Sequence, residues 1–287
     1  MSRMLALAVA VLVALPGAWA QDEEPKDEKE KAKQAAAVAQ KAIDAYRADL
    51  AKAKNDDDIA AAIQDNLDTA DPHPLIRAVL ANLLQTHPRI EVRITAASSL
   101  GRYKKDRDVA RILFQNAKSQ RDEGLQKKCL QRFGAVAPYG MSVDLKAWFY
   151  GENLVLAREA IEAAESINSI RMLQPLVELL GELEAIREDK PQDGGGNYGP
   201  PPPGVPQGGS NQNNEKVKRK KELIDVTRKA INVIWKKHDP KSRLNTYKDA
   251  NLAVQRNRKF LDKIRADEDA EDNGVKPLPK DEKKESK

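Results

Sequence analysis

The chain has 287 residues, of which 40% are hydrophobic, 32% are charged and only 5% are aromatic. Residues with high helix propensity dominate, and the alternating β-branched runs that indicate strands are missing. The composition therefore predicts an all-α protein. The net charge is +5 but unevenly spread, since residues 216–265 hold 17 Lys and Arg against 5 Asp and Glu. Such an asymmetry can mark a site for an anionic partner.

Residues 1–20 have the three parts of a secretory signal peptide. Arg3 supplies a short positive region, an apolar run extends from Leu5 to Leu15, and Ala18-Trp19-Ala20 fits the small-x-small pattern of a cleavage site. The apolar run is too short to remain as a membrane anchor. We therefore expect cleavage after Ala20 and a secreted or periplasmic chain with no transmembrane segment after cleavage.

The first helices are marked by spacing and by capping residues. Residues 21–32 are charged and lack apolar periodicity, so we expect them to be disordered. A helix is predicted from Lys33 to Ala53, where apolar residues recur at steps of four and three. The run from Asn55 to Asp58 then offers an N-cap and negative charge to the next helix. A calcium loop is the alternative for these acids, but the D-x-D-x-D-G spacing is absent.

The histidines and the cysteine favour structural roles. His73-Pro74 and His87-Pro88 each mark a helix start, because proline at the first helical position loses no hydrogen bond. Zinc ligation by these histidines is the alternative, but His238 is distant and no Cys cluster accompanies them. Cys129 is the single Cys, so we expect a buried, inert thiol and no intramolecular disulfide.

One spacing recurs along the chain. An apolar residue is followed, after three residues of any type, by two small or apolar residues; after two more residues of any type comes another apolar residue, and then Gly or a polar residue. The segment VRITAASSLGRY, starting at Val92, fills this spacing, and copies follow at Leu125 and Leu156, after 33 and 31 residues. Further matches start at Ile76 and Val226. Segments of helical pattern lie between the copies, namely DVARILFQNAKS, SVDLKAWFYG and SIRMLQPLVELLGELEAI. Because one amphipathic pair cannot bury its apolar faces alone, the pattern predicts stacked helix pairs.

VRITAASSLG resembles the V-R-x-x-A-A-x-x-L-G helix of the HEAT-repeat and HEAT-like families. The copies LQKKCLQRFG and LAREAIEAAE lack a counterpart of Arg93, and the third lacks the closing Gly. The repeats are also shorter than the usual length of about 40 residues. The resemblance covers about residues 57–190. It implies a short HEAT-like α-solenoid of stacked antiparallel helix pairs, over residues 33–190, that serves as a scaffold or binding platform; it transfers no catalytic residues.

A Gly/Pro/Asn-rich segment, residues 191–214, interrupts the helical pattern. Its four consecutive prolines favour polyproline II, and its Gly, Asn and Gln residues cannot bury a core. We interpret it as a long loop insertion inside a helix pair, with an inter-domain linker or a peptide ligand as alternatives. Residues 215–266 then read as basic C-terminal helices that complete or cap the solenoid, the last from Thr246 to Ala266. Residues 267–287 read as a disordered charged tail.

The sequence holds no Gly-rich phosphate loop and no H-E-x-x-H, G-x-S-x-G or C-x-x-C motif. We therefore predict a non-enzymatic exported scaffold, without cofactor or metal, that binds a protein or peptide; an enzyme on a helical scaffold ranks third. The alternative is a binder of anionic surfaces, such as a wall polymer, lipid headgroups or, least expected, nucleic acid, through the basic helix 216–236. A solvated helix start is the plainer reading of KVKRKK. The candidate residues are Lys216, Lys218, Arg219, Lys220, Lys221, Arg228 and Lys229.

Overall fold

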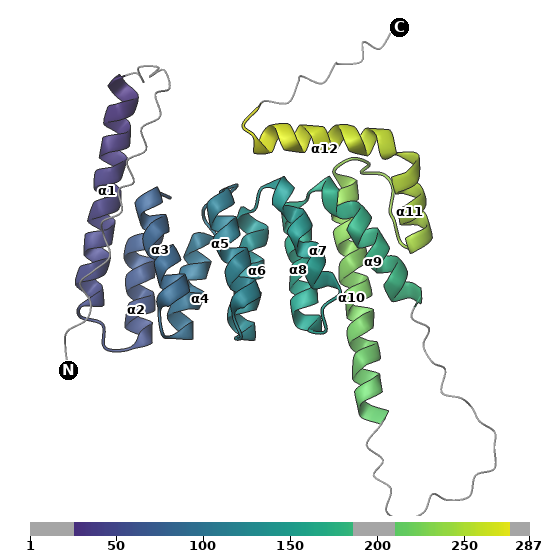
Figure 1. Ribbon diagram of the computed structural model, residues 1–287, viewed down its shortest axis with the longest axis horizontal. Helices are drawn as coiled ribbons and strands as arrows, with labels where there is room; N and C mark the ends of the chain where they lie inside the picture. The colour runs from purple at the N-terminus through teal and green to yellow at the C-terminus, as the bar shows by residue number, and fades with distance from the viewer. Residues whose placement is uncertain (1–25, 186–209, 276–287) are drawn as a thin grey trace, which may run out of the picture.

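A computed structural model describes residues 26–185 and 210–275, with side chains described for 27–185 and 220–275 (Figure 1). This part of the chain is built of helices and contains no strand, which confirms the all-α class. The predicted signal peptide, residues 1–20, and residues 191–209 of the predicted Gly/Pro-rich loop lie outside the described residues.

Helices account for most of the described residues. In chain order they are α1 (Lys26–Leu50), α2 (Asp56–Ala62), the π-helix η1 (Ile63–Asp68), α3 (Pro74–Thr86), α4 (Ile90–Leu100), α5 (Arg107–Ser119), α6 (Glu123–Val136), the 3₁₀-helix η2 (Tyr139–Leu145), α7 (Lys146–Phe149), α8 (Leu154–Ile167), the 3₁₀-helix η3 (Ile170–Met172), α9 (Leu173–Ala185), α10 (Ser210–Lys236), α11 (Tyr247–Arg256) and α12 (Arg258–Asp272).

The predicted capping residues occupy helix ends. Asn55 Oδ1 accepts the Asp58 N–H at 2.8 Å, and the Asp58 carboxylate accepts the Asn55 N–H at 3.3 Å, which forms a capping box at the start of α2. His73 caps α3, where its Nδ1 accepts the Leu75 N–H at 3.2 Å and Pro74 is the first helical residue. His87 ends α3, and α4 begins only at Ile90. The interpretation of both histidines as turn residues is confirmed, whereas Pro88 lies before the helix start.

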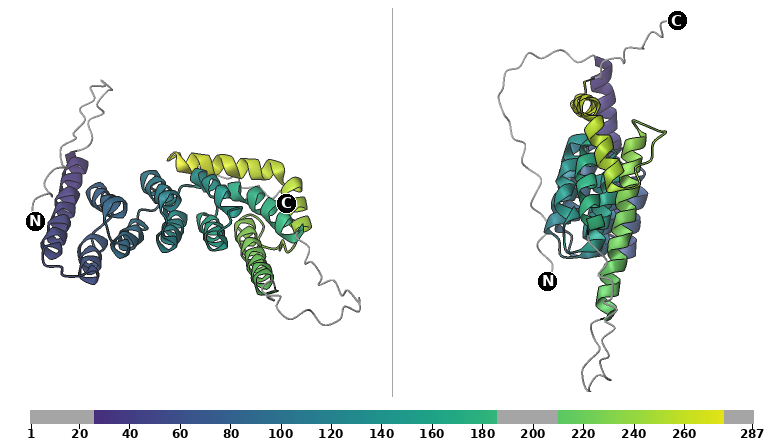
Figure 2. Two further views of the ribbon diagram at one scale, coloured as in Figure 1. Left: turned by 60° about the horizontal axis from the view of Figure 1, so that its bottom comes forward. Right: turned by 90° about the vertical axis from the view of Figure 1, so that its right-hand side faces the viewer.

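The helices from α3 to α10 form a row of pairs, with α3 against α4, α5 against α6, α7 against α8 and α9 against α10 (Figures 1 and 2). The second members of the pairs also pack on one another in succession, α4 on α6, α6 on α8 and α8 on α10. Helix α10 therefore follows α8 in this layer although residues 186–209 separate it from α9 in the sequence.

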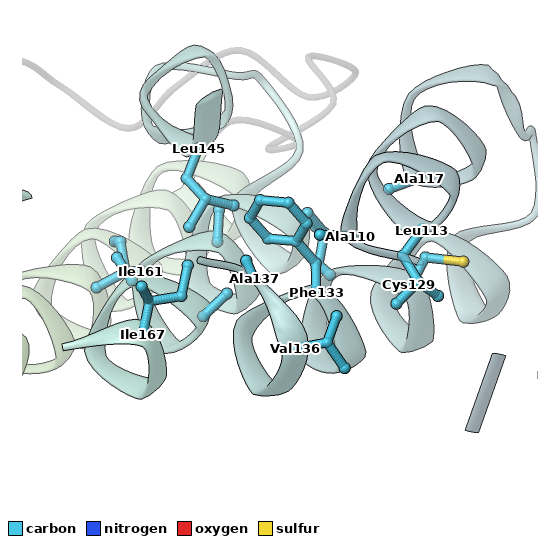
Figure 3. Packing of buried hydrophobic residues seen from close by; sticks show 14 of the residues in the cluster. Ala110, Leu113, Ala117, Cys129, Phe133, Val136, Ala137, Leu145, Ile161 and Ile167 are labelled. Carbon is cyan, nitrogen blue, oxygen red and sulfur yellow. The ribbon is translucent and has the colours of Figure 1, made fainter. Parts of the chain in front are cut away.

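The recurring spacing marks the residues of one continuous core. The small and apolar positions of all five copies are buried apart from the half-buried Val226, whereas the closing position ranges from the buried Gly134 to the exposed Gln85. Figure 3 shows part of this core, where Phe133 of α6 lies among side chains of α5, η2 and α8. Cys129 is buried in the same cluster, and burial raises the pKa of its thiol to about 12, so the thiol is protonated at neutral pH.

The closest approach in the row lies between α6 and α8. A Cβ atom added to Gly134 would lie 2.7 Å from the Ala163 Cα and 3.0 Å from its Cβ. Real Cβ atoms do not come so close to backbone, so only glycine lets these two helices meet at this distance. The Gly of the second copy is thus required by packing.

Three segments that we expected to lack regular structure are helical in part. Helix α1 begins at Lys26, within residues 21–32, because oppositely charged residues three and four apart support an exposed helix there. Helix α10 begins at Ser210, within residues 191–214, immediately after the last Gly and Pro of that segment. Helix α12 continues to Asp272, within residues 267–287.

Two predicted helices are divided differently in the structure. The last helix, predicted from Thr246 to Ala266, is two helices that meet at Asn257. The segment SVDLKAWFYG forms part of the 3₁₀-helix η2 and the four-residue helix α7, because Pro138 restricts the chain just before η2 and Gly151 ends the segment.

Helix α12 lies across the ends of the helices in the second half of the row (Figure 1), where it contacts η2 and η3 and is held by its carboxylates. Glu268, only 4% exposed, accepts the Ser169 hydroxyl at 2.7 Å and the Ile170 N–H at 2.8 Å. Arg171 pairs with Asp269 of the same helix. Burial raises the pKa of Glu268, and this effect outweighs the lowering by the Ile170 and Ser169 hydrogen bonds.

We predict that Gly134→Ala destabilises the protein. Overpacking against backbone costs up to about 3 kcal/mol, more than the roughly 1 kcal/mol that Ala gains over Gly inside a helix. The free energy of unfolding in urea should fall by about 1–2 kcal/mol. Gly124→Ala is the matched control, because its Cβ would meet only an Asp122 oxygen at 3.3 Å. Equal stability of both variants would contradict the packing argument.

We also predict a pH dependence that Glu268→Gln removes. Because the pKa of Glu268 is raised in the folded state, the folded chain holds this proton more tightly than the unfolded chain. Stability from this group is therefore greatest below its unfolded pKa and declines as the pH rises through the raised pKa. Urea unfolding between about pH 4 and about pH 7 should show wild type losing stability relative to Glu268→Gln. Parallel curves for the two proteins would show that the residue does not titrate abnormally.

Candidate functional site

A groove of about 760 Å³ lies between α5 and η2. Helix α5 contributes most of its lining, and η2 contributes the opposite wall. The lining residues are Arg107, Arg111, Phe114, Gln115, Lys118 and Ser119 of α5, and Gly140, Met141 and Asp144 of η2.

Three cations follow one face of α5. Arg107, Arg111 and Lys118 are separated by four and seven residues, which places them on one side of a helix with 3.6 residues per turn. All three are exposed. Arg111 has an exposed neighbour, Asp108, at 3.7 Å, whereas Arg107 and Lys118 have no acidic partner within the described part of the chain. The groove therefore presents positive charge that the fold leaves uncompensated.

The cations border two half-buried apolar side chains, Phe114 and Met141. The Phe114 ring packs at 5.4 Å from the Phe133 ring, so it is held in place by the core while one side lines the groove. Met141 faces it from η2. A ligand in this groove would meet both charge and apolar surface.

Helix α12 fixes the wall formed by η2. The Asp272 carboxylate accepts the Tyr139 N–H at 3.0 Å and the Gly140 N–H at 2.6 Å, which satisfies two of the free donors at the start of η2. The Lys105 ammonium lies 3.1 Å from the centre of the Tyr139 ring and 3.5 Å from Glu271 of α12. The groove thus depends on contacts between residues far apart in the sequence.

Asp144 is the one acid of the groove lining. Partial burial raises the pKa of its carboxyl above the ordinary value. Because the lining has three cations and only this one acid, its net charge is positive. The negative charge of Asp144 sits on the η2 wall, opposite the cations of α5.

A second groove, of about 480 Å³, lies between α6, α8 and α10, and both cations of its lining pair with acids of the same lining. The buried Glu159 accepts hydrogen bonds from Lys127 at 2.8 Å and from Gln131 at 3.0 Å. Arg158 pairs with Glu162 at 3.0 Å. The groove between α5 and η2 is therefore the better candidate site, because two of its cations, Arg107 and Lys118, are available to a ligand.

The predicted anion-binding residues whose side chains are described, Lys220, Lys221, Arg228 and Lys229, are not among the lining residues of either groove. Lys216, Lys218 and Arg219 have side chains outside the described residues, while Lys220 is half-buried and Lys221 is exposed on α10.

The two remaining candidates, Arg228 and Lys229, bind acids of the same chain. Arg228 pairs with Glu184 of α9 at 2.9 Å, and Lys229 pairs with Glu165 of α8 at 2.9 Å. The pKa of Lys229 is raised by its hydrogen bond with Glu165. These cations join α10 to its neighbours, which gives them a structural role.

Other kinds of site have little support in the described ranges. No group of three or more His, Cys, Asp and Glu side chains there could hold a metal ion. Within residues 26–185 and 210–275, no helix is both long and apolar enough to cross a membrane. Comparison with family models, curated proteins and solved structures found no significant match to this chain.

Only one of the two walls of the groove could have been recognised in the sequence. The spacing of Arg107, Arg111 and Lys118 along α5 could have been recognised as a charged stripe. The η2 wall could not, because the segment around Met141 has no helical periodicity that places it, and the contact with Asp272 joins residues 132 and 133 positions apart.

We predict that Asp272→Ala loosens η2. Two backbone N–H groups lose their acceptor, which should cost about 1 kcal/mol, as for the loss of a helix cap. Removal of an acid from the C-terminal turn of α12 should slightly favour α12 itself, so the effect should concentrate in η2. Hydrogen exchange of residues 139–145 should accelerate. The control is Asp267→Ala in the same helix, because the Asp267 side chain has no hydrogen bond or ion pair in the described part of the chain. Equal exchange rates in the two variants would contradict the role of Asp272.

Proposed function

We propose that the protein is an exported, HEAT-like helical-repeat scaffold that binds a protein or peptide in the groove between α5 and η2. The observation that carries the proposal is the row of three exposed cations, Arg107, Arg111 and Lys118, beside the half-buried Phe114 and Met141; in the described part of the chain, only Arg111 has an acidic partner. Arg and aromatic side chains around an apolar centre are characteristic of protein-binding surfaces. The proposal assigns binding to this surface and no catalytic step.

The packing of helix pairs supports the short α-solenoid. The pairs succeed one another in a row, and the recurring small and apolar residues of α4, α6, α8 and α10, the second members of the pairs, belong to one core or pack against it. Arg93, which carries part of the HEAT resemblance, donates to the Leu84 carbonyl at 2.7 Å and so binds the end of the preceding helix. Because α9 and α10 pack together, residues between them are best interpreted as a loop insertion inside one pair.

Selection from a library of random displayed peptides, with the chain from Gln21 onward as target, tests this function. We expect enriched peptides whose binding is lost in Gln115→Trp, because a large side chain at this exposed groove position blocks entry whatever the ligand's charge. Gln85→Trp, at an exposed position of α3, is the control and should bind normally. If no peptide is enriched, the binding function is wrong; if Gln115→Trp binds normally, the groove is wrong.

A further inference from the structure

We infer that the groove between α5 and η2 recognises an acidic peptide segment that carries an apolar side chain. This inference rests on the proposed function and adds the chemistry of the partner. The charge of the lining, the spacing of its cations and its apolar centre support this chemistry.

The charge of the lining selects for carboxylates. Three of its residues are cations, and only Asp144 is an acid. Arg107 and Lys118 are exposed and have no acidic partner in the described ranges, so a ligand's carboxylates would not have to displace an existing ion pair. Guanidinium groups also bind carboxylates with two parallel hydrogen bonds, which adds orientation to attraction.

The spacing of the cations fits a short peptide. Arg107 and Lys118 are eleven residues apart on α5, which corresponds to about 16 Å at the rise of an α-helix. An extended chain covers that distance in about five residues. A peptide with acids near both ends of such a stretch could therefore pair with the whole row.

The apolar centre separates a peptide from other polyanions. Phe114 of α5 and Met141 of η2 are half-buried in the groove lining. A sulfated polysaccharide or a phosphate polymer would place mostly charged or hydroxylated groups against them and would gain less from their burial than an apolar side chain. An apolar side chain of a peptide would cover them, and the flexible thioether of Met141 can adapt to its shape.

Asp144 adds a rule for the partner's sequence. Its carboxylate stands on the wall opposite the cations, so an acid placed against it would be repelled. The face of the peptide turned to η2 should therefore be neutral, whereas the face turned to α5 should be acidic. This asymmetry distinguishes a specific peptide from a uniform run of Glu.

The test measures fluorescence polarisation of a labelled peptide in which Glu residues flank one central Trp, added to the chain from Gln21 onward. We expect binding that weakens as salt is raised. Arg107→Glu, Arg111→Glu and Lys118→Glu together should weaken it at least about tenfold. The control reverses Lys248, Arg258 and Lys259, which are exposed, change the net charge equally and have no ion pair in the described part. Both variants are first compared with wild type by circular dichroism.

A double-mutant cycle tests the apolar centre. Met141→Gln should weaken binding of the Trp peptide several-fold. It should hardly affect a peptide in which Ser replaces Trp, because either change alone already removes the contact between Trp and Met141. Additive losses would contradict the contact. Heparin, a polyanion without apolar groups, serves as a competitor. Binding of heparin that depends on the three cations but exceeds that of the Trp peptide would replace the inference with a polyanion site.

The outcomes separate this inference from the proposed function. If library peptides bind and depend on Gln115 but the Glu–Trp peptide does not bind, the scaffold stands and the acidic chemistry is wrong. If the charge-reversed groove and its control bind the Glu–Trp peptide equally, the site is wrong. If neither library peptides nor the Glu–Trp peptide bind, both proposals fail.

Discussion

The close contact of α6 and α8 at Gly134 and Ala163 sets the arrangement of the row. At this position the two helices meet through backbone and Cβ atoms. The neighbouring α4 and α10 then pack on the outer sides of the same layer. A larger residue at position 134 would separate α6 from α8 and disturb the positions of their partners α5 and α7. The groove between α5 and η2 would change with them, because both of its walls rest on this pair of helices.

Carboxylates of α12 hold this helix against the 3₁₀-helices η2 and η3. Glu268 and Asp272, one helical turn apart on α12, each accept N–H groups at the start of a 3₁₀-helix, η3 and η2 respectively. A carboxylate at such a position compensates free donors and the positive end of the helix dipole. One helix from the C-terminal part of the chain thus fixes two turns of the row, and one of these turns forms the wall of the candidate site.

Local signals in the sequence predicted the parts of the fold that depend on neighbours in the chain. The Asn55 and His73 caps act within three residues, and the recurring spacing identified core positions such as Ala96 and Leu130. The role of Glu268 could not be predicted, because its partners Ser169 and Ile170 lie almost a hundred residues away. In the sequence these acids are typical of a solvated tail, and only the folded structure places free N–H groups beside them.

The same limit explains why the strongest basic signal and the candidate site differ. Charge density along the sequence drew attention to α10, yet there Arg228 and Lys229 face acids of α9 and α8. The cations of α5 are fewer, and their helix also carries Asp108, so its composition is unremarkable. What distinguishes them is the absence of acidic partners for Arg107 and Lys118 among the described residues, together with the apolar surface beside them. Pairing of this kind is a property of the three-dimensional arrangement, and it decides which charges can serve a partner.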